Sequence, residues 1–518
     1  MAPEGSLTPR RVFAFLAMVF GMFMAILDIQ IVSASLSEIQ AGLSASSDEV
    51  AWVQTAYLIA EVIMIPLSGI LGRILSTRVL FTISAIGFTA ASFLCSTATS
   101  IDQMMIYRAI QGFIGGGMIP SVFAAAFTIF PRSKQNIVSP MIGLVATLAP
   151  TIGPTIGGYL SNTYSWHWLF LVNVPPGILV AIAVWNLVDF DKPEPELMKR
   201  FDWWGLAGLA AFLGPLEYVL EEGPQNDWLN DNAVFWMAIL CVTGCVTFFW
   251  RAFRASLPVV DLSAFRNVNF AVGCIFSFVM GIGLYGMTYL YPVYLAGIRG
   301  YDSLMIGETM FVSGLAMFFT APVSGMLSSK FDPRFMLIVG FLGFGLSCWL
   351  LTGLTDQWDF WELLVPQILR GMSLMLCMVP INNLALGTLD AARMRGASGL
   401  YNLMRNLGGA VGLALINTLL IQRGTLHYER LAEGVTWANA QVMAQLATMT
   451  QGMQALGIAD PAAGAMAQLA GMVKKQASVL SFIDVFELLT VLFVVLSVLA
   501  VAMRKPAPRG GPAAGGGH

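Results

Sequence analysis

The chain has 518 residues, of which 57% are hydrophobic and only 11% are charged, with a mean hydropathy of +0.73 and a net charge of −3. A soluble domain carries about 25% charged residues, so a soluble protein of this composition could not hide its apolar surface, whereas a lipid bilayer can solvate it. The slightly acidic balance does not suggest nucleic acid as a partner, and the six cysteines show no metal-ligand spacing. Composition therefore predicts an all-α polytopic membrane protein that needs no bound metal or cofactor.

Fourteen stretches reach the length of about 20 mostly apolar residues that a membrane-spanning helix needs. The first follows Arg10 and Arg11 and is too long for a cleaved signal peptide. The predicted spans cover residues 12–36, 50–70, 79–99, 104–128, 136–160, 167–188, 203–221, 233–250, 270–298, 304–328, 335–354, 361–388, 396–421 and 479–503.

Basic residues orient these spans. Of the 27 Lys and Arg residues, 19 lie in segments that are cytoplasmic if the chain starts inside, five lie on the opposite side, and three (Arg108, Arg370 and Arg405) fall within spans. Cytoplasmic loops carry the excess of Lys and Arg, and a wrong helix count would invert this bias partway along the chain. We therefore expect both termini in the cytoplasm.

An internal repeat divides the chain. Residues 66–78 read PLSGILGRILSTR and residues 322–334 read PVSGMLSSKFDPR, with Pro, Ser, Gly, Leu and Arg at identical spacing. Both copies lie at the cytoplasmic end of the second span of a half, and transporters built from repeats place the substrate site between their halves. The predicted units are a cytoplasmic tail (1–11), an N-terminal six-helix bundle (12–190), two extra linker helices (203–250), a cytoplasmic connection (251–269), a C-terminal six-helix bundle (270–503) and a disordered cytoplasmic tail (504–518).

Residues 422–478, within the second bundle, form a long loop on the outer face. Apolar residues recur at helical spacing up to Leu456, Gly457 ends that run, and Asp460 and Pro461 suit the cap and first position of another helix. We expect a helical hairpin, which is either a flap that packs on itself or a docking element for a periplasmic partner.

Charged residues inside spans are costly and usually face the protein interior or a water-filled path. Asp28 lies in the first span and Glu61 in the second, and because burial favours the neutral form of a carboxylic acid, either could carry a proton or meet a cationic substrate. Either could instead simply pair with a buried arginine such as Arg108, whose face Gln111 would share. Glu217, in the first linker helix, is expected to snorkel towards the surface, with a functional role as the alternative.

Small and aromatic residues suggest how the helices pack and what lines a cavity. Three GxxxG pairs would let helix backbones approach closely, either as static packing or as sliding surfaces during alternating access: Gly112 and Gly116, Gly153 and Gly157, and Gly408 and Gly412. Pro150 and Pro154 would kink the fifth span. The aromatic and methionine side chains of the ninth span suit varied apolar or cationic ligands.

At these motifs the sequence resembles the major facilitator superfamily, specifically its 14-helix drug:proton antiporters of EmrB/QacA type. The similar runs are LDIQIV (27–32), GILGRILSTR (69–78), YRAIQGFIGGG (107–117), GPTIGG (153–158), SWHWLFLVNVPPG (165–177) and YNLMRNLGGAVG (401–412). GPTIGG is similar to the antiporter motif, which importers of the superfamily typically lack. Three positions depart from the family: Gln30 stands where threonine is usual, Arg73 where aspartate is usual and Ser76 where glycine is usual.

The resemblance implies the major facilitator fold, with two six-helix bundles plus two helices, in the inner membrane of a bacterium. It also implies a proton-coupled exporter of drugs or other small lipophilic or cationic compounds, powered by the proton gradient. The outer loop, ending in FIDVFELL (482–489), is similar to the EmrB form, which implies a periplasmic membrane-fusion adaptor and an outer-membrane channel as partners.

We expect Asp28, Glu61 and Arg108 to couple transport to protons. The other residues expected to act are substrate contacts (Gln30, Gln111, Tyr285, Tyr289, Tyr291, Asn382, Asn402 and Arg405), conformational residues of the antiporter motif (Gly153, Pro154, Gly157 and Gly158) and gating residues of the loop at 69–78 (Gly69, Arg73 and Arg78).

Two other functions stay open at this point. An exporter of one dedicated metabolite, such as a siderophore, a signal or a toxic acid, would use the same fold. A membrane-embedded enzyme would need a nucleophile with a base or a metal cluster, and the three histidines (His167, His427 and His518) lie at or beyond predicted helix ends and far apart in sequence.

Overall fold

The computed structural model describes residues 8–502 apart from positions 34, 131–134, 388, 390 and 458, so the predicted tail at 504–518 lies outside the described residues. Thirteen helices of the described part are long and apolar enough to cross a membrane, and a bent pair, Ile137–Ala149 and Thr151–Thr163, supplies a fourteenth. The prediction of an all-α polytopic membrane protein is confirmed.

The first six spans and the helices between them precede residue 188. They are α1 (Pro9–Ser33), the short α2 (Leu36–Leu43), α3 (Ser47–Leu75), α4 (Thr77–Ser96), a span formed by α5 (Ile101–Gly115) and α6 (Met118–Ile129), α7 (Gln135–Thr163), and a span formed by α8 (Trp168–Leu171) and α9 (Val174–Leu187).

Two linker spans and six further spans follow. The linker spans are α10 (Trp203–Glu222) and α11 (Asn232–Arg254), and the later helices are α12 (Val268–Tyr294) with the π-helical turn η5 (Leu295–Arg299), α13 (Ser303–Lys330), α14 (Pro333–Leu350), α15 (Phe360–Ala385), α16 (Ala391–Glu433), α17 (Ala440–Ala455) and α18 (Pro461–Ala502). Short 3-10 turns lie in the connections: η2 (Pro195–Arg200), η3 (Trp228–Asn230), η4 (Leu262–Arg266) and η6 (Leu351–Gly353).

Side-chain caps fix several helix starts. At α3, Ser46 and Glu49 form a reciprocal capping box, and the hydrogen bonds from Ser46 lower the pKa of the Glu49 carboxyl. At α10, Asp202 accepts from the backbone N–H of Gly205 and also pairs with Arg251 of α11 at 2.7 Å, which holds the two linker helices together.

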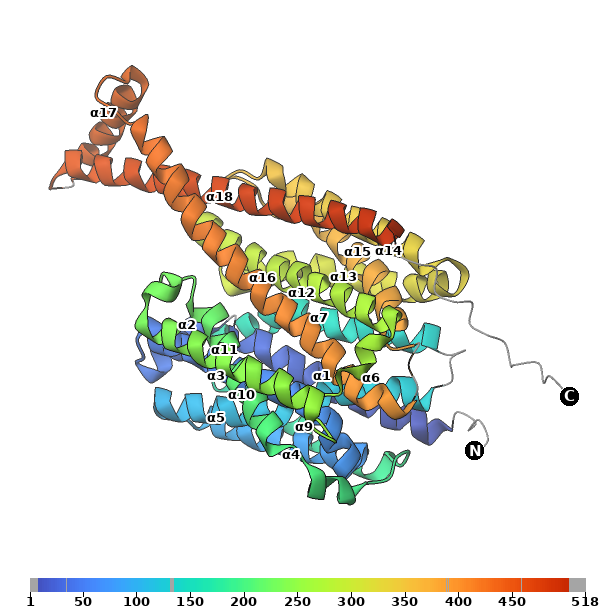
Figure 1. The fold of residues 1–518 in the computed structure, drawn as a ribbon. Coiled ribbons are helices and arrows are strands. Elements are labelled where there is room, and N and C mark those ends of the chain that lie inside the picture. Colours follow the sequence, from blue (N-terminus) through green and yellow to red (C-terminus); the bar gives the residue numbers. More distant parts are fainter. Residues whose placement is uncertain are drawn as a thin grey trace, which may run out of the picture.

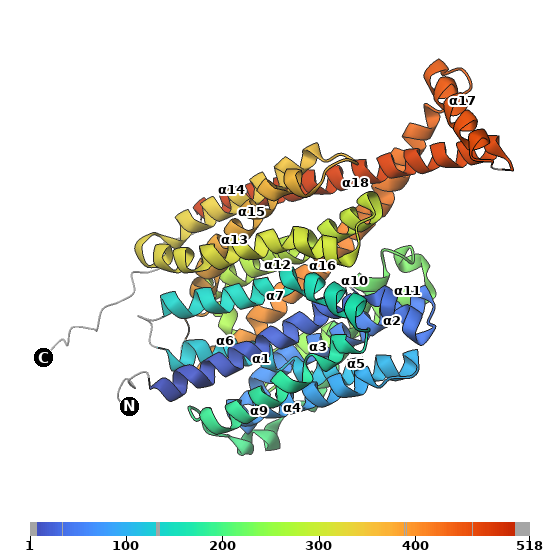
Figure 2. The same ribbon diagram turned by 180° about the vertical axis from the view of Figure 1, so that it is seen from behind.

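The halves adjoin each other along several helices. Figures 1 and 2 show two bundles side by side, with the start of α1 and the end of α18 at one end of the molecule and α17 at the other. Across the boundary α7 packs against α13 and α15, while α16 packs against α3 and α6. The linker helix α10 packs against α3 of the first half and α16 of the second, so it bridges them.

Two helices extend well beyond the predicted spans. The thirteenth span was expected to end at residue 421 and the fourteenth to begin at 479, but α16 runs without a break to Glu433 and α18 begins at Pro461. Hydropathy marks only the part of a helix that lipid must cover, whereas these polar extensions are stabilised by packing of α16 and α17 on α18. Gly457 adopts a φ of +72° after α17, and Asp460 accepts from the N–H of Ala463 at 3.1 Å, as a cap should.

Candidate functional site

A fully buried ion pair lies inside the first half. Nη1 of Arg108 on α5 donates to Oδ2 of Asp28 on α1 at 2.6 Å, and both side chains are 0% exposed. Charges in such a place are tolerated only when they are paired and their remaining hydrogen-bonding groups are satisfied. Asp28 lies five residues before the last residue of α1, so the pair sits towards the end of the bundle away from the termini.

Three neutral side chains complete the surroundings of Asp28. Nδ2 of Asn173 donates to its Oδ1 at 2.7 Å, and Nε2 of Gln111 donates to the same oxygen at 3.2 Å and to Oγ of Ser92 at 2.8 Å. Oε1 of Gln111 in turn accepts from Arg108 at 2.7 Å. The carboxylate therefore holds α1, α5 and the α8–α9 junction together through polar contacts.

Arg108 also touches α3 of the same half. Its Nε donates to the backbone oxygen of Val53 at 3.2 Å, and its guanidinium lies over the Tyr57 ring at 4.2 Å. Nη2 of Arg108 and the hydroxyl of Tyr57 have no hydrogen-bond partner among the described residues. α5 can lie this close to α3 because Gly112 has no Cβ. A Cβ at this position would clash with the backbone oxygen of Tyr57.

Glu61 lies one turn further along α3, at the boundary between the halves. It is only 3% exposed, and its Oε1 has no hydrogen-bond partner in the described part of the chain. Arg108, Asp28 and Arg405 all act on it electrostatically. Glu61 thus stands between the ion pair of the first half and a buried arginine of the second.

Arg370 is the buried arginine inside the second half. Its Nη2 donates to Oγ1 of Thr288 at 2.6 Å, its Nη1 donates to Oε1 of Gln367 at 3.4 Å, and its guanidinium lies 5.6 Å from the centre of the Tyr291 ring. None of the ion pairs among the described residues involves it.

The arginines of the two halves occupy related positions. A Cβ at Gly371 would clash with the backbone oxygen of Ser313, just as one at Gly112 would clash with that of Tyr57. Tyr57 and Ser313 are 256 residues apart, the same separation as the repeat motifs at Pro66 and Pro322. The helix pairs α3–α5 and α13–α15 therefore pack in the same register, which supports a duplication.

When the two halves are aligned on Gly112 and Gly371, an arginine and a glutamine exchange positions. Arg108 and Gln111 precede Gly112 by four and one residues, whereas Gln367 and Arg370 precede Gly371 by four and one residues. The glutamine and arginine have swapped places. No acid among the described residues pairs with Arg370, and the hydroxyl of Thr288 receives the arginine's hydrogen bond instead.

The predicted substrate contacts of the second half fall into two groups, whereas Gln30 and Gln111 lie on α1 and α5 of the first half. Tyr285 donates to Oδ1 of Asn406 at 3.3 Å, and Tyr289 on the same face of α12 bonds to Asn417 of α16. Tyr291 does not join them, since it packs inside the half beside Arg370.

The other predicted contacts lie on α15 and α16 near the boundary with the first half. Asn382 accepts from the hydroxyl of Tyr401, and Nη2 of Arg405 donates to Oδ1 of Asn402 at 2.8 Å. The Arg405 guanidinium lies 5.6 Å from the centre of the Phe123 ring of α6, so this group spans both halves.

The GPTIGG run at 153–158 packs against the helix that carries Asp28. A Cβ at Gly153 would clash with Cβ of Gln30, and one at Gly157 would lie 2.7 Å from the backbone oxygen of Ile31. Pro154 and Gly158 are buried. α7 is bent by 42° between Ala149 and Thr151, which agrees with the predicted kink.

The predicted gating loop at 69–78 consists of the end of α3 and the start of α4, with only Ser76 between them, and it is tied to the segment after the sixth span. Nη2 of Arg73 pairs with Oε2 of Glu194 at 3.2 Å, and both the N–H and the hydroxyl of Thr77 donate to Asp191. Arg78 lies over the Trp185 ring at 4.4 Å, and Gly69 is buried. The loop is therefore anchored within its own half.

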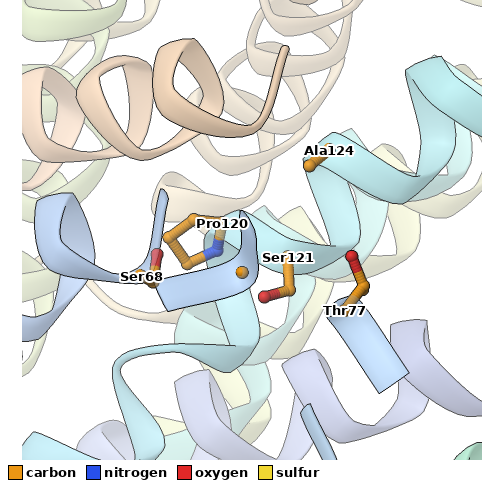
Figure 3. A pocket seen from close by; sticks show the side chains of 6 residues that line it. Ser68, Thr77, Pro120, Ser121 and Ala124 are labelled. Carbon is orange, nitrogen blue, oxygen red and sulfur yellow. The ribbon is translucent and has the colours of Figure 1, made fainter. Parts of the chain in front are cut away.

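The backbone conformation of Ser76 is one that glycine adopts more easily, which explains why glycine is usual at this position. Its backbone has φ 77° and ψ 155°, a region that residues with a Cβ rarely adopt and that costs about 1–3 kcal/mol. Beside it, a small open pocket between α3, α4 and α6, shown in Figure 3, is lined by Ser68, Gly72, Thr77, Pro120, Ser121 and Ala124. This pocket lies on the side of the first bundle that carries the loop and is separate from the Asp28 network.

Sequence reasoning missed three polar residues and misplaced a fourth. Ser92, Asn173 and Thr288 were overlooked because small polar residues in apolar runs give no distinctive pattern, although Asn173 lies in the NVPPG run singled out for its family likeness. The expectation for Glu217 was wrong: it is only 7% exposed and is not at the surface. A snorkelling residue must reach past a helix end, whereas Glu217 lies on the part of α10 that packs between α3 and α16.

Comparisons with known proteins agree with this architecture. The profile of the Major Facilitator Superfamily matches residues 18–413. The colistin resistance protein EmrB of Acinetobacter baumannii is 44% identical over 491 residues, which cover 95% of this chain and 96% of that protein. The fatty acid resistance protein FarB of Neisseria gonorrhoeae and the multidrug export protein EmrB of Escherichia coli are each 28% identical over 505 residues, or 97% of both chains.

The solved structure of the human organic anion transporter MFSD10 has a TM-score of 0.58 with 14% identity, covering 94% of this chain and 100% of its own. At that identity the likeness is one of fold.

Proposed function

Because the chain belongs to the Major Facilitator Superfamily, we propose that it is a proton-coupled exporter of small lipophilic or cationic organic compounds that works by alternating access. The named relatives that are resistance and multidrug export proteins support export of toxic compounds. The proposed energy source is the proton gradient across a bacterial inner membrane.

The observation that carries the proposal is the ion pair between Asp28 and Arg108. Both side chains are fully buried, so each charge depends on the other. A proton on Asp28 would remove its charge and leave Arg108 without a counterion. The protonated and deprotonated protein would then favour different helix arrangements, which is what coupling a proton to a conformational change requires.

The packing of the helices around Asp28 could transmit the effect of its protonation to the boundary between the halves. α7 touches α1 at Gln30, two residues after Asp28, and on its other side Thr155 touches Gly307 of α13. A shift of α1 on protonation would therefore act on the α7–α13 packing. Glu61, between Asp28 and Arg405, is the proposed second acidic group of the cycle.

A transport assay with purified protein in proteoliposomes tests the proposal. An imposed proton gradient should drive accumulation of a lipophilic cation such as tetraphenylphosphonium, and a protonophore that collapses the gradient should abolish it. Accumulation that ignores the gradient, or none with any of a panel of lipophilic compounds, would contradict the proposal.

We further infer that the projecting ends of α16 and α18, with α17, dock a periplasmic adaptor that leads to an outer-membrane channel, and that both termini are cytoplasmic. Trp437 and Leu456, at the tip of the projection, are 76% and 78% exposed, and exposed apolar side chains of this size suit a covering partner. The double variant Trp437→Asp, Leu456→Asp should keep transport in proteoliposomes but lose resistance in cells. Full cellular resistance of this variant would contradict the docking role.

A further inference from the structure

The first linker helix brings acidic side chains to the boundary between the halves. Glu217 of α10 is more than nine-tenths buried, yet it takes part in no ion pair or hydrogen bond with the described residues. Gly214, one turn earlier, lies against Ile59 and Ile63 of α3, so this stretch of α10 packs on the helix that carries Glu61.

Three carboxylates and two tyrosines converge there. Glu61 acts electrostatically on Glu217, and both act on Tyr285 of α12. Glu221, one turn after Glu217 on α10, acts on Tyr289, one turn after Tyr285. Each of these acids of α10 therefore lies within electrostatic range of a tyrosine of α12, with one helical turn between the two acids and one between the two tyrosines.

The arginines near these carboxylates donate their hydrogen bonds to other groups. Arg405 is the arginine of the second half that acts on Glu61 and Tyr285, and it donates through Nη2 to Asn402 rather than to a carboxylate. Arg108 is committed to Asp28. The buried Oε1 of Glu61 has no hydrogen-bond partner within the described chain, and neither have Nε and Nη1 of Arg405, so this carboxyl group is open to a further partner.

We propose that Glu217 and Glu221 of α10, together with Glu61, Tyr285 and Tyr289, form a binding site for the cationic group of a lipophilic substrate. The carboxylates supply the countercharge and the tyrosine rings supply faces that attract an organic cation. The linker helices then do more than enlarge the fold: α10 contributes the residues that select substrate charge. This inference rests on the proposed export function and names the substrate class that the exporter selects.

A pair of ions with the same shape and opposite charge tests the site. Binding of tetraphenylphosphonium and of tetraphenylborate is measured on full-length protein in nanodiscs, without a proton gradient, for the wild type and for Glu217→Gln, Glu221→Gln and the double variant. Glu222→Gln is the matched control, because Glu222 lies on the same helix but bonds to Asn226.

The double variant should bind tetraphenylphosphonium about tenfold more weakly or worse, as expected for loss of charge-assisted contacts, and bind tetraphenylborate no more weakly than the wild type. Glu222→Gln should bind both ions as the wild type does. Unchanged tetraphenylphosphonium binding by the double variant, or equal loss of both ions, would overturn the site, since equal loss indicates a merely structural role.

Failure of the export proposal gives a different result. If the wild type binds tetraphenylphosphonium with the predicted charge selectivity but an imposed proton gradient moves no compound, the cation site stands and proton-coupled export does not.

Discussion

In the first half of the transporter Arg108 faces the carboxylate of Asp28, whereas in the second half Arg370 donates to the hydroxyl of Thr288. The scaffold around them is shared, since Gly112 and Gly371 bring equivalent helix pairs into contact. Duplication has thus preserved a buried arginine twice but an acid only once. Under the proposed function, the first half would carry the proton chemistry and the second half would provide a fixed positive charge.

Removal of each arginine in turn should separate these roles most clearly. Arg108→Met leaves the Asp28 carboxylate buried without its partner and should lower the free energy of unfolding by about 3–5 kcal/mol. Arg370→Met leaves the hydroxyl of Thr288 and the amide of Gln367 without the arginine's hydrogen bonds but leaves no unpaired charge. It should lower the free energy of unfolding by no more than about 2 kcal/mol. Unfolding of both variants in detergent micelles measures the difference, and equal losses would remove the contrast between the halves.

The order of glutamine and arginine found in the second half can be introduced into the first half by mutation. Gln111 already reaches Oδ1 of Asp28, so an arginine at 111 should still reach the carboxylate. Arg108→Gln alone should lose about 3 kcal/mol of stability, and the double variant Arg108→Gln, Gln111→Arg should regain at least half of that loss. The same unfolding experiment measures both, and a double variant no more stable than the single one would show that position 111 cannot hold the charge.

The two glycines give matched tests of the shared packing. An alanine at Gly112 or at Gly371 places a methyl group against backbone of the neighbouring helix, so each variant should be destabilised by about 1–3 kcal/mol through overpacking. Both losses should be similar when measured in parallel. A neutral effect at one glycine only would mean that the two helix pairs are not equivalent.

The smallest expected effects are at the helix caps of the repeat. Ser76 and Asp332 hold the same place in the two copies, but Ser76 has a φ of 77° and Asp332 one of −64° with a capping bond to the N–H of Arg334. Ser76→Gly should therefore stabilise the protein by about 1 kcal/mol. Asp332→Gly should not stabilise it, because it loses a cap without relieving strain. Thermal unfolding would contradict this if the two variants shifted the midpoint in the same direction.

The sequence was sufficient for the fold because lipid imposes a simple requirement: each span needs a long apolar run, and fourteen such runs predicted the fourteen spans of the structure. It also pointed to Asp28 and Arg108, since charged residues stand out in apolar surroundings. It could not reveal that Asn173 donates to Asp28 or that Ser92 accepts from Gln111, because contacts between distant spans depend on helix rotation and packing.

The misjudged residues have the same physical cause. Glu217 was expected at the surface because its helix seemed peripheral by position in the chain, whereas packing of α10 between α3 and α16 buries it. Tyr291 was grouped with Tyr285 and Tyr289 by composition, but helical geometry turns it towards Arg370 instead.

Proton movement in proteoliposomes that contain Asp28→Asn tests most directly whether the acid of the first half couples transport to protons. A pH-sensitive dye inside the vesicles reports proton flux while a gradient of tetraphenylphosphonium is imposed. The wild type should move protons in the opposite direction to the cation, and Asp28→Asn should still exchange the cation down its gradient but move no protons with it. Proton movement of wild-type size in Asp28→Asn would contradict the role of Asp28.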